Sequence, residues 1–177
     1  MAYAPANLPA NLDDTVIVAL GSELAGPYAS SEALLEAAVA EIQARGVRVL
    51  ARSRWWRSAA WPDPAQPEYR NGVAIVRGKG GPDELLALLR AVEAHFGREP
   101  GPRNAPRTLD LDLIAHGRFK LDTPGLVLPH PRAHERLFVM GPLAEIAPAW
   151  RDPISGTTAE KLAAAASVGL DATPIIS

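Results

Sequence analysis

A two-residue alternation of charge and hydrophobicity runs through Pro106-Arg107-Thr108-Leu109-Asp110-Leu111-Asp112-Leu113-Ile114. In an extended strand, successive side chains point to opposite faces, so the two aspartates share one face and the three leucines share the other. The leucine face is expected to enter a core. The aspartate face then presents two carboxylates about 7 Å apart along the strand.

Two neighbouring carboxylates repel each other unless a cation lies between them. Asp110 and Asp112 are therefore candidate ligands for Mg²⁺, a hard ion that prefers oxygen donors. Arg107, just upstream, can hold a phosphate that the metal also holds. An Asp-Leu-Asp unit is also typical of glycosyltransferases that bind a sugar nucleotide, and exposed strands carry functionless aspartates, so the motif alone leaves the chemistry open.

Composition narrows the class of protein. The 177 residues fit one domain, and a hydrophobic content of 47% allows a sizeable core. The formal net charge of −2 argues against a nucleic-acid partner bound by bulk charge. The chain has no cysteine, which excludes disulfides and thiolate zinc sites.

The N-terminal residues 1–14 are polar and lack the apolar segment of a signal peptide, so we expect a loose tail followed by a single domain over residues 15–177. Apolar runs elsewhere are too short to span a bilayer. The sequence therefore predicts a cytoplasmic protein without a membrane partner.

Hydrophobic periodicity predicts the order β-α-β-β-α-β. We expect strands at 15–20, 47–58 and 71–76 and from residue 109 onward, with helices at 31–45 and 82–97. Beyond residue 129 the pattern is less regular, and Thr157 with Glu160 fits a capping box for a last helix. The order predicts an α+β protein with a ferredoxin-like βαββαβ sandwich, an antiparallel-rich sheet with helices on one face, and a C-terminal extension.

No P-loop motif occurs, so arginines and metal would have to bind nucleotide phosphates. Arg98 and Arg103 lie in a loop that Gly97 and Gly101 can hinge over a triphosphate; a solvated surface loop is the plain alternative. Trp61 can cover a flat ligand if it is exposed.

A further cluster lies at residues 128–138. His130 and His134 lack a third ligand at zinc spacing, so a nucleotide contact by His130 is the better interpretation. Arg136 can reach a phosphate or a ribose. Phe138 on its own is more typical of a core than of a stacking platform.

Taken together, the motifs resemble those of the 6-hydroxymethyl-7,8-dihydropterin pyrophosphokinase family of folate biosynthesis. The resemblance runs from about Val16 to Ala149 and is strongest over Pro106 to Asp112. Supporting stretches, in the same order along the chain, are Ala19-Leu20-Gly21-Ser22, Pro67-Glu68-Tyr69-Arg70-Asn71, Phe96-Gly97-Arg98, Leu128-Pro129-His130, Arg136-Leu137-Phe138, Pro142-Leu143 and Glu145-Ile146-Ala147-Pro148.

The resemblance implies transfer of pyrophosphate from ATP, the co-substrate, to the hydroxymethyl group of a reduced pterin, which leaves AMP. It implies two Mg²⁺ ions between the phosphates and the two aspartates, and a monomer that acts on small molecules. It assigns catalysis to Arg98 and Arg107. The implied pterin contacts are Ser58, Trp61, Tyr69, Asn71, Phe138 and Asp110, and the implied nucleotide contacts are Glu93, Arg103, Arg107, Leu113, His130 and Arg136.

One departure is Glu23, which stands where the family usually has asparagine and cannot donate the hydrogen bond of an amide. The alternatives from the residues alone are a metal-dependent nucleotide-sugar transferase, which leaves Tyr69, Asn71 and Phe138 without a role, and a non-catalytic ferredoxin-like binding module.

Overall fold

The computed structural model describes residues 8–60, 63–97 and 108–176. Four of the predicted site residues lie outside this part of the chain: Trp61, Arg98, Arg103 and Arg107. The strands are β1 (Val16–Ser22), β2 (Arg48–Arg52), β3 (Trp56–Ser58), β4 (Tyr69–Arg77), β5 (Asp110–His116), β6 (Leu121–Thr123), β7 (Leu126–Leu128) and β8 (Thr173–Pro174). The α-helices are α1 (Ser31–Ala44), α2 (Pro82–His95), α3 (Leu137–Ile146) and α4 (Ala159–Ala165), and short 3₁₀ helices are η2 (Leu12–Asp14) and η3 (Ala133–Glu135).

The main sheet confirms the ferredoxin-like prediction. Its strand order is β5-β1-β4-β3-β8, and β2 also pairs with β4. Since β4 is antiparallel to both β1 and β2, the unit β1-α1-β2 is split by β4, and β1 splits β4-α2-β5 in the same way. The β6–β7 pair forms a separate hairpin.

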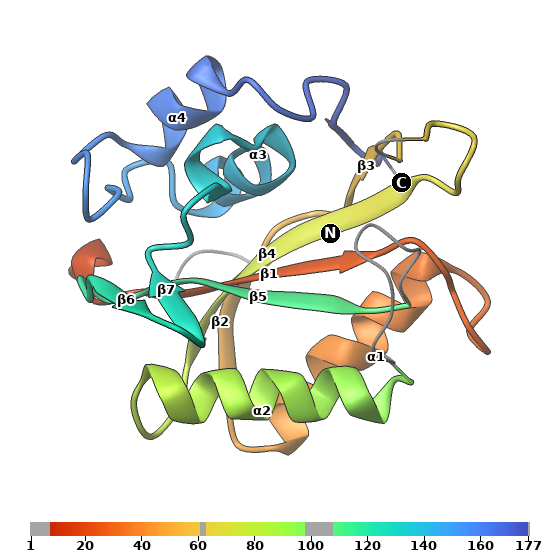
Figure 1. Ribbon diagram of the computed structural model, residues 1–177, viewed down its shortest axis with the longest axis horizontal. Helices are drawn as coiled ribbons and strands as arrows, with labels where there is room; N and C mark the ends of the chain where they lie inside the picture. The colour runs from red at the N-terminus through yellow and green to blue at the C-terminus, as the bar shows by residue number, and fades with distance from the viewer. Residues whose placement is uncertain (1–7, 61–62, 98–107, 177) are drawn as a thin grey trace.

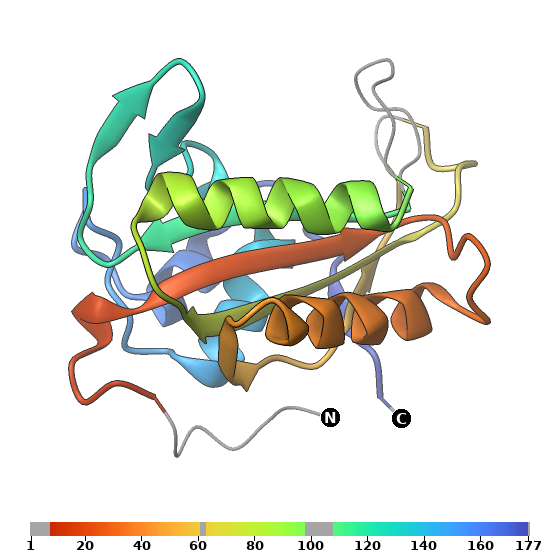
Figure 2. The same ribbon diagram turned by 90° about the horizontal axis from the view of Figure 1, so that it is seen from below.

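Helices cover both faces of the sheet rather than one. Figures 1 and 2 show α1 and α2 side by side on one face, with α3 and α4 on the opposite face. The second layer differs from the prediction because α3 was not expected. Its ten residues include Pro142 and are apolar on almost every side, so they show no helical periodicity.

The predicted strand at 47–58 divides into β2 and β3. Around the break, the side chains of Trp55 and Trp56 point to opposite faces: the Trp55 Nε1 atom donates to Glu36 of α1, and the Trp56 Nε1 atom donates to Glu145 of α3, both at 2.9 Å. The segment therefore ties both helical layers to the sheet.

The last helix is capped by Thr158, which accepts from the Lys161 amide, and not by Thr157 as predicted.

Two hydrophobic clusters separate the faces. The cluster beneath α1 and α2 contains Leu109, Leu111 and Leu113, whereas the cluster beneath α3 contains Ile17, Val73 and other residues of the opposite face. The burial of the leucines confirms the predicted alternation in β5. In the described part of the chain, no helix is long and apolar enough to cross a membrane.

Candidate active site

Asp110 and Asp112 lie on the α3 face of the sheet, at the edge strand β5. Strand register continues their row across the sheet: Asp110 is opposite Gly21, and Gly21 is opposite Asn71. Directly paired residues share a face. A Cβ at Gly21 would come within 3.0 Å of the Asn71 Oδ1 atom. Glycine therefore leaves the space between the Asp110 carboxylate and the Asn71 amide free of a side chain.

Predicted pterin residues continue this row on the same face, on strands β4 and β3. Ser58 of β3 is paired with Tyr69 of β4, two positions from Asn71 on the same face. Ser58 is buried, and the side chains of Tyr69 and Asn71 are half-buried. The structure thus brings Ser58, Tyr69 and Asn71 to the face that carries the two aspartates.

Side chains of α2 hold the outer edge of β5 between the two aspartates. The Leu111 amide donates to the Glu93 Oε2 atom at 2.8 Å, and the Leu111 carbonyl accepts from the Arg90 Nη1 atom at 2.9 Å. Arg90 also pairs with Glu93 at 2.6 Å. We call these contacts of Glu93 and Arg90 with the Leu111 backbone the Leu111 clamp. Since an unpaired strand edge leaves its polar groups exposed or unsatisfied, the clamp fixes the backbone from which both carboxylates project.

Glu93 is 2% exposed, so it is a buried carboxylate and not a surface one. A contact between Glu93 and a nucleotide stays a prediction. Arg90 was missed by the sequence reasoning, although its position three residues before Glu93 on one helix is a recognisable signal for a charge pair. The Leu113 side chain is 4% exposed within the core, which leaves only its backbone available to a nucleotide.

His130 is attached to the same edge of β5. Its amide donates to the Ile114 carbonyl at 2.8 Å, and its Nδ1 atom accepts from the Arg132 amide at 3.2 Å. Burial, with the positive charge of Arg136, lowers the pKa of His130 to about 4. At neutral pH the imidazole is therefore uncharged, and with Nδ1 as an acceptor its Nε2 atom carries the proton and can donate.

Arg136 and Phe138 begin α3 beside this site. Arg136 is the N-cap residue of the helix, and its guanidinium carbon lies 5.7 Å from the centroid of the Phe138 ring. Both side chains are half-buried. The positive charge of Arg136 also acts on the ionisation of Asp112 and His130, which locates all three groups within electrostatic reach of one another.

The two aspartates form a carboxylate pair with excess negative charge. Burial and the neighbouring Asp110 carboxylate raise the pKa of Asp112 to about 6, despite the opposing effect of Arg90 and Arg136. A bound cation would relieve this repulsion, and oxygen donors suit Mg²⁺. Within residues 8–60, 63–97 and 108–176, no group of three or more His, Cys, Asp or Glu residues could hold a metal by itself. The pair therefore fits a cation whose remaining ligands come from substrate or water.

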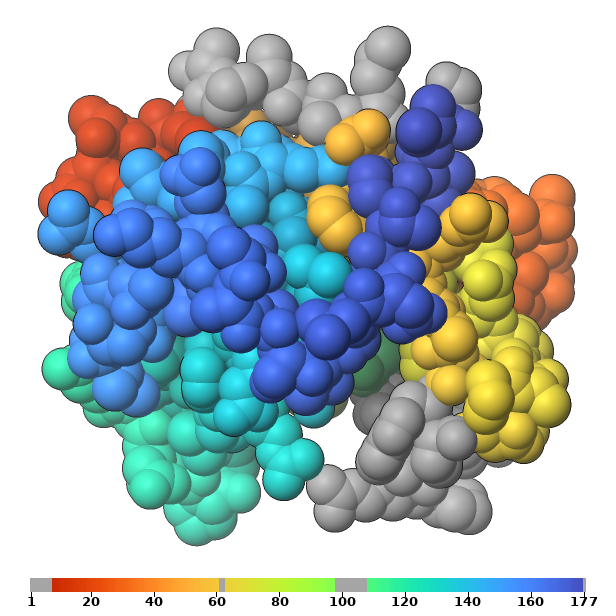
Figure 3. All heavy atoms as spheres, turned by 90° about the horizontal axis from the view of Figure 1, so that it is seen from above, coloured from red at the N-terminus to blue at the C-terminus, as the bar shows by residue number. Residues whose placement is uncertain are grey.

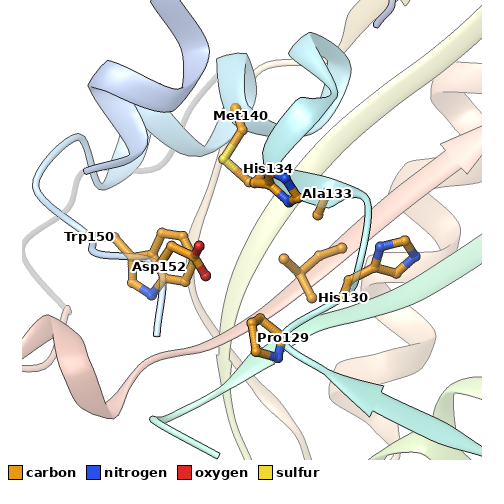
Figure 4. A pocket seen from close by; sticks show the side chains of 8 residues that line it. Pro129, His130, Ala133, His134, Met140, Trp150 and Asp152 are labelled. Carbon is orange, nitrogen blue, oxygen red and sulfur yellow. The ribbon is translucent and has the colours of Figure 1, made fainter. Parts of the chain in front are cut away.

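A small cavity lies behind His130, between β5, η3 and α3 (Figure 4). Its volume of about 10 Å³ leaves room for roughly one water molecule, so it cannot be a substrate site. His130, His134, Met140, Trp150 and Asp152 contribute to its lining.

Figure 3 shows a separate, open hollow on this side of the molecule, between the cyan start of α3, the dark-blue C-terminal segment and the yellow region before β4.

Comparisons with known proteins agree with the motifs. Residues 17–148 match the sequence model of the 7,8-dihydro-6-hydroxymethylpterin-pyrophosphokinase family. A 2-amino-4-hydroxy-6-hydroxymethyldihydropteridine pyrophosphokinase of Synechocystis is 45% identical over 143 residues, which cover 80% of this chain and 71% of the relative. The enzyme of the same name from Pseudomonas aeruginosa is 38% identical over 159 residues, with coverages of 90% and 96%.

Among solved structures, a crystal structure of the Plasmodium falciparum HPPK-DHPS triple mutant superimposes with a TM-score of 0.67. The sequence identity is 11%, so this likeness supports the fold alone. The match covers 85% of this chain and 44% of that protein.

The raised pKa of Asp112 predicts that its charge destabilises the ligand-free fold. The folded-state pKa of about 6 exceeds the reference value of 3.8, so the folded state binds the proton more tightly and stability falls as pH rises between these values. We expect Asp112→Asn to raise the melting temperature at pH 7.5 by about 2–4 °C, as about 1 kcal/mol does in a domain of this size. The gain should vanish near pH 4. Thermal unfolding measures it, with Asp122→Asn on β6 as an exposed control; an unchanged or lowered melting temperature would contradict the assignment.

The clamp on Leu111 predicts a graded loss of stability. Glu93→Ala leaves a buried amide without its acceptor, which costs about 1–3 kcal/mol. Glu93→Gln keeps one acceptor and should lose less. Denaturant unfolding of both variants tests this order, and equal stability of Glu93→Ala and the wild type would show that the clamp does not hold the strand.

Proposed function

Because this chain belongs to the 7,8-dihydro-6-hydroxymethylpterin-pyrophosphokinase family, and is therefore an enzyme that transfers pyrophosphate from ATP to 6-hydroxymethyl-7,8-dihydropterin in folate biosynthesis, we propose that the reaction takes place on the α3 face at β5. The observation that carries this proposal is that strand register places Asp110 and Asn71 on one face, on either side of Gly21. The products are AMP and the pterin diphosphate.

We propose that Asp110 and Asp112 hold two Mg²⁺ ions together with the phosphates of ATP. The raised pKa of Asp112 and the all-oxygen donor set support this role. When bound, the ions neutralise phosphate charge and lower the repulsion that an attacking alcohol meets. The Leu111 clamp, built by Glu93 and Arg90, keeps the two carboxylates in register before substrate arrives.

The reduced pterin is proposed to bind over the row between β3 and β5. A pterin has an aromatic face and a polar edge, so it needs a stacking ring and hydrogen-bonding groups. Phe138 at the start of α3 supplies a ring, and Asn71, Tyr69 and Ser58 supply polar groups from the sheet. Asp110 lies where this row meets the metal ligands. Trp61 follows Ser58 by three residues and stays a predicted cover for the ligand.

The triphosphate is proposed to lie along β5 and the start of α3. A neutral His130 with its Nε2 proton available can donate to a phosphate or ribose oxygen, and Arg136 adds a fixed positive charge. Arg98, Arg103 and Arg107 lie between α2 and β5 in the sequence and stay predicted contacts, of which Arg98 and Arg107 are the proposed catalytic cations. Glu93 and Leu113 support the site from the core side.

We also propose that the enzyme acts as a monomer in the cytoplasm. No observation favours the nucleotide-sugar transferase or the non-catalytic module. Glu23, which stands where the family usually has asparagine, is 9% exposed and held within the structure instead of projecting freely into solvent.

The test of the function is the nucleotide product. Purified protein with ATP, Mg²⁺ and 6-hydroxymethyl-7,8-dihydropterin should release AMP, and Asp112→Asn should lower kcat/KM at least tenfold, about 1.4 kcal/mol of barrier. Chromatography of the nucleotides measures both, with Asp122→Asn as the matched control. Release of ADP would contradict pyrophosphate transfer, and a smaller loss in Asp112→Asn would contradict its metal role.

A further inference from the structure

The C-terminal segment 167–175, here called the strap, crosses the α3 face from η3 to β3. It lies beyond the residues that match the family model, which end at residue 148. Figure 1 shows it descending from α4 toward β3, and Figure 3 shows its dark-blue atoms at the border of the open hollow. The strap therefore touches both walls of the proposed pterin site.

Backbone hydrogen bonds attach the first part of the strap to the start of α3. The amides of Ser167 and Val168 both donate to the Glu135 carbonyl at 3.0 Å, and the Leu137 amide donates to the Val168 carbonyl at 2.9 Å. These bonds bracket Arg136, which forms a parallel bridge with Val168. The start of α3 is thus fixed by a segment about 30 residues further along the chain.

The other end of the strap is attached to the β3 wall. Strand β8 pairs with Trp56 and Arg57, and the Ile175 amide donates to the Trp55 carbonyl at 2.9 Å. Between these two ends, the Asp171 Oδ2 atom accepts from the Ala59 amide at 2.6 Å. Ala59 directly follows Ser58, so this carboxylate holds the backbone at the end of the predicted pterin row.

Gly169 is the point at which the strap meets Phe138. Its φ of +68° favours glycine, and a Cβ built there would lie 2.5 Å from the Phe138 Cδ1 atom and 2.9 Å from the Cε1 atom. An aromatic ring cannot bend away as a flexible side chain does. The position of the ring therefore depends on the absence of a side chain at residue 169.

We propose that the strap positions the residues that bind the pterin. Gly169 leaves room for the Phe138 ring and so fixes its position, and Asp171 binds the Ala59 amide on the opposite side of the pterin site. This inference rests on the proposed function, because it takes Phe138 and Ser58 as pterin contacts. It adds two residues that contact no substrate and act through those that do. Substitutions at these two residues should affect the pterin and spare ATP, since Gly169 contacts Phe138 and Asp171 binds the Ala59 amide, and neither takes part in the Arg136–Val168 bridge.

Steady-state kinetics of Gly169→Ala, with each substrate varied in turn, tests the proposal. We expect the KM for the pterin to rise about tenfold, as a loss of about 1.4 kcal/mol would cause, while the KM for ATP stays within about twofold. Gly156→Ala is the matched control: Gly156 has a φ of +71° and no atom within 4 Å of a built Cβ, so it carries the same backbone strain without a ring contact. The control should leave both KM values unchanged.

Asp171→Ala provides a second, independent readout if Gly169→Ala unfolds. Loss of the bond to the Ala59 amide should raise the pterin KM about threefold without changing the ATP KM, as a hydrogen bond worth about 0.7 kcal/mol predicts. Equal changes in both KM values, or a pterin KM that does not move in any folded variant, would overturn the strap proposal. Failure of the wild type to release AMP would overturn the proposed function instead, so the two outcomes are distinguishable.

Discussion

The burial of Leu109, Leu111 and Leu113 beneath α1 and α2 is the constraint on which the site depends. With those side chains in the core, the period of two leaves Asp110 and Asp112 no position except the opposite face. The strand is also an edge strand, so its outer polar groups need partners. Glu93 and Arg90 satisfy the groups at Leu111, and the His130 amide satisfies the carbonyl of Ile114. The same contacts that complete the edge therefore bring His130 to the aspartates.

Much of the fold could be predicted because its signals are local. The β5 alternation and the helical periodicity at 31–45 and 82–97 each indicated an element, and the order of the elements indicated the split sheet. Helix α3 escaped prediction because it is apolar nearly all round and contains Pro142. The division of the strand at 47–58 escaped it because two adjacent tryptophans bind different helices, a tertiary contact that periodicity does not record.

The sequence proposed the residues of the candidate site but not the contacts that support them. The Asp-Leu-Asp motif predicted a carboxylate pair, the cluster at 128–138 suggested His130 and Arg136 as nucleotide contacts, and the resemblance added Asn71 and Phe138 as pterin contacts. The roles of Gly21, Arg90 and the strap depend on register and close approach between distant segments. The fold also gathers negative charge at Asp112, keeps His130 neutral and brings the charge of Arg136 within electrostatic reach of both, an arrangement that favours polyphosphate with divalent cations.

A crystal structure with a non-hydrolysable ATP analogue, the pterin and Mn²⁺ in place of Mg²⁺ would show whether the two aspartates bind the cation. We expect anomalous density within coordination distance of both the Asp110 and Asp112 carboxylates, shared with oxygens of the nucleotide, while the pterin lies over Asn71. Nucleotide and pterin bound in the hollow with no metal at either aspartate would contradict it.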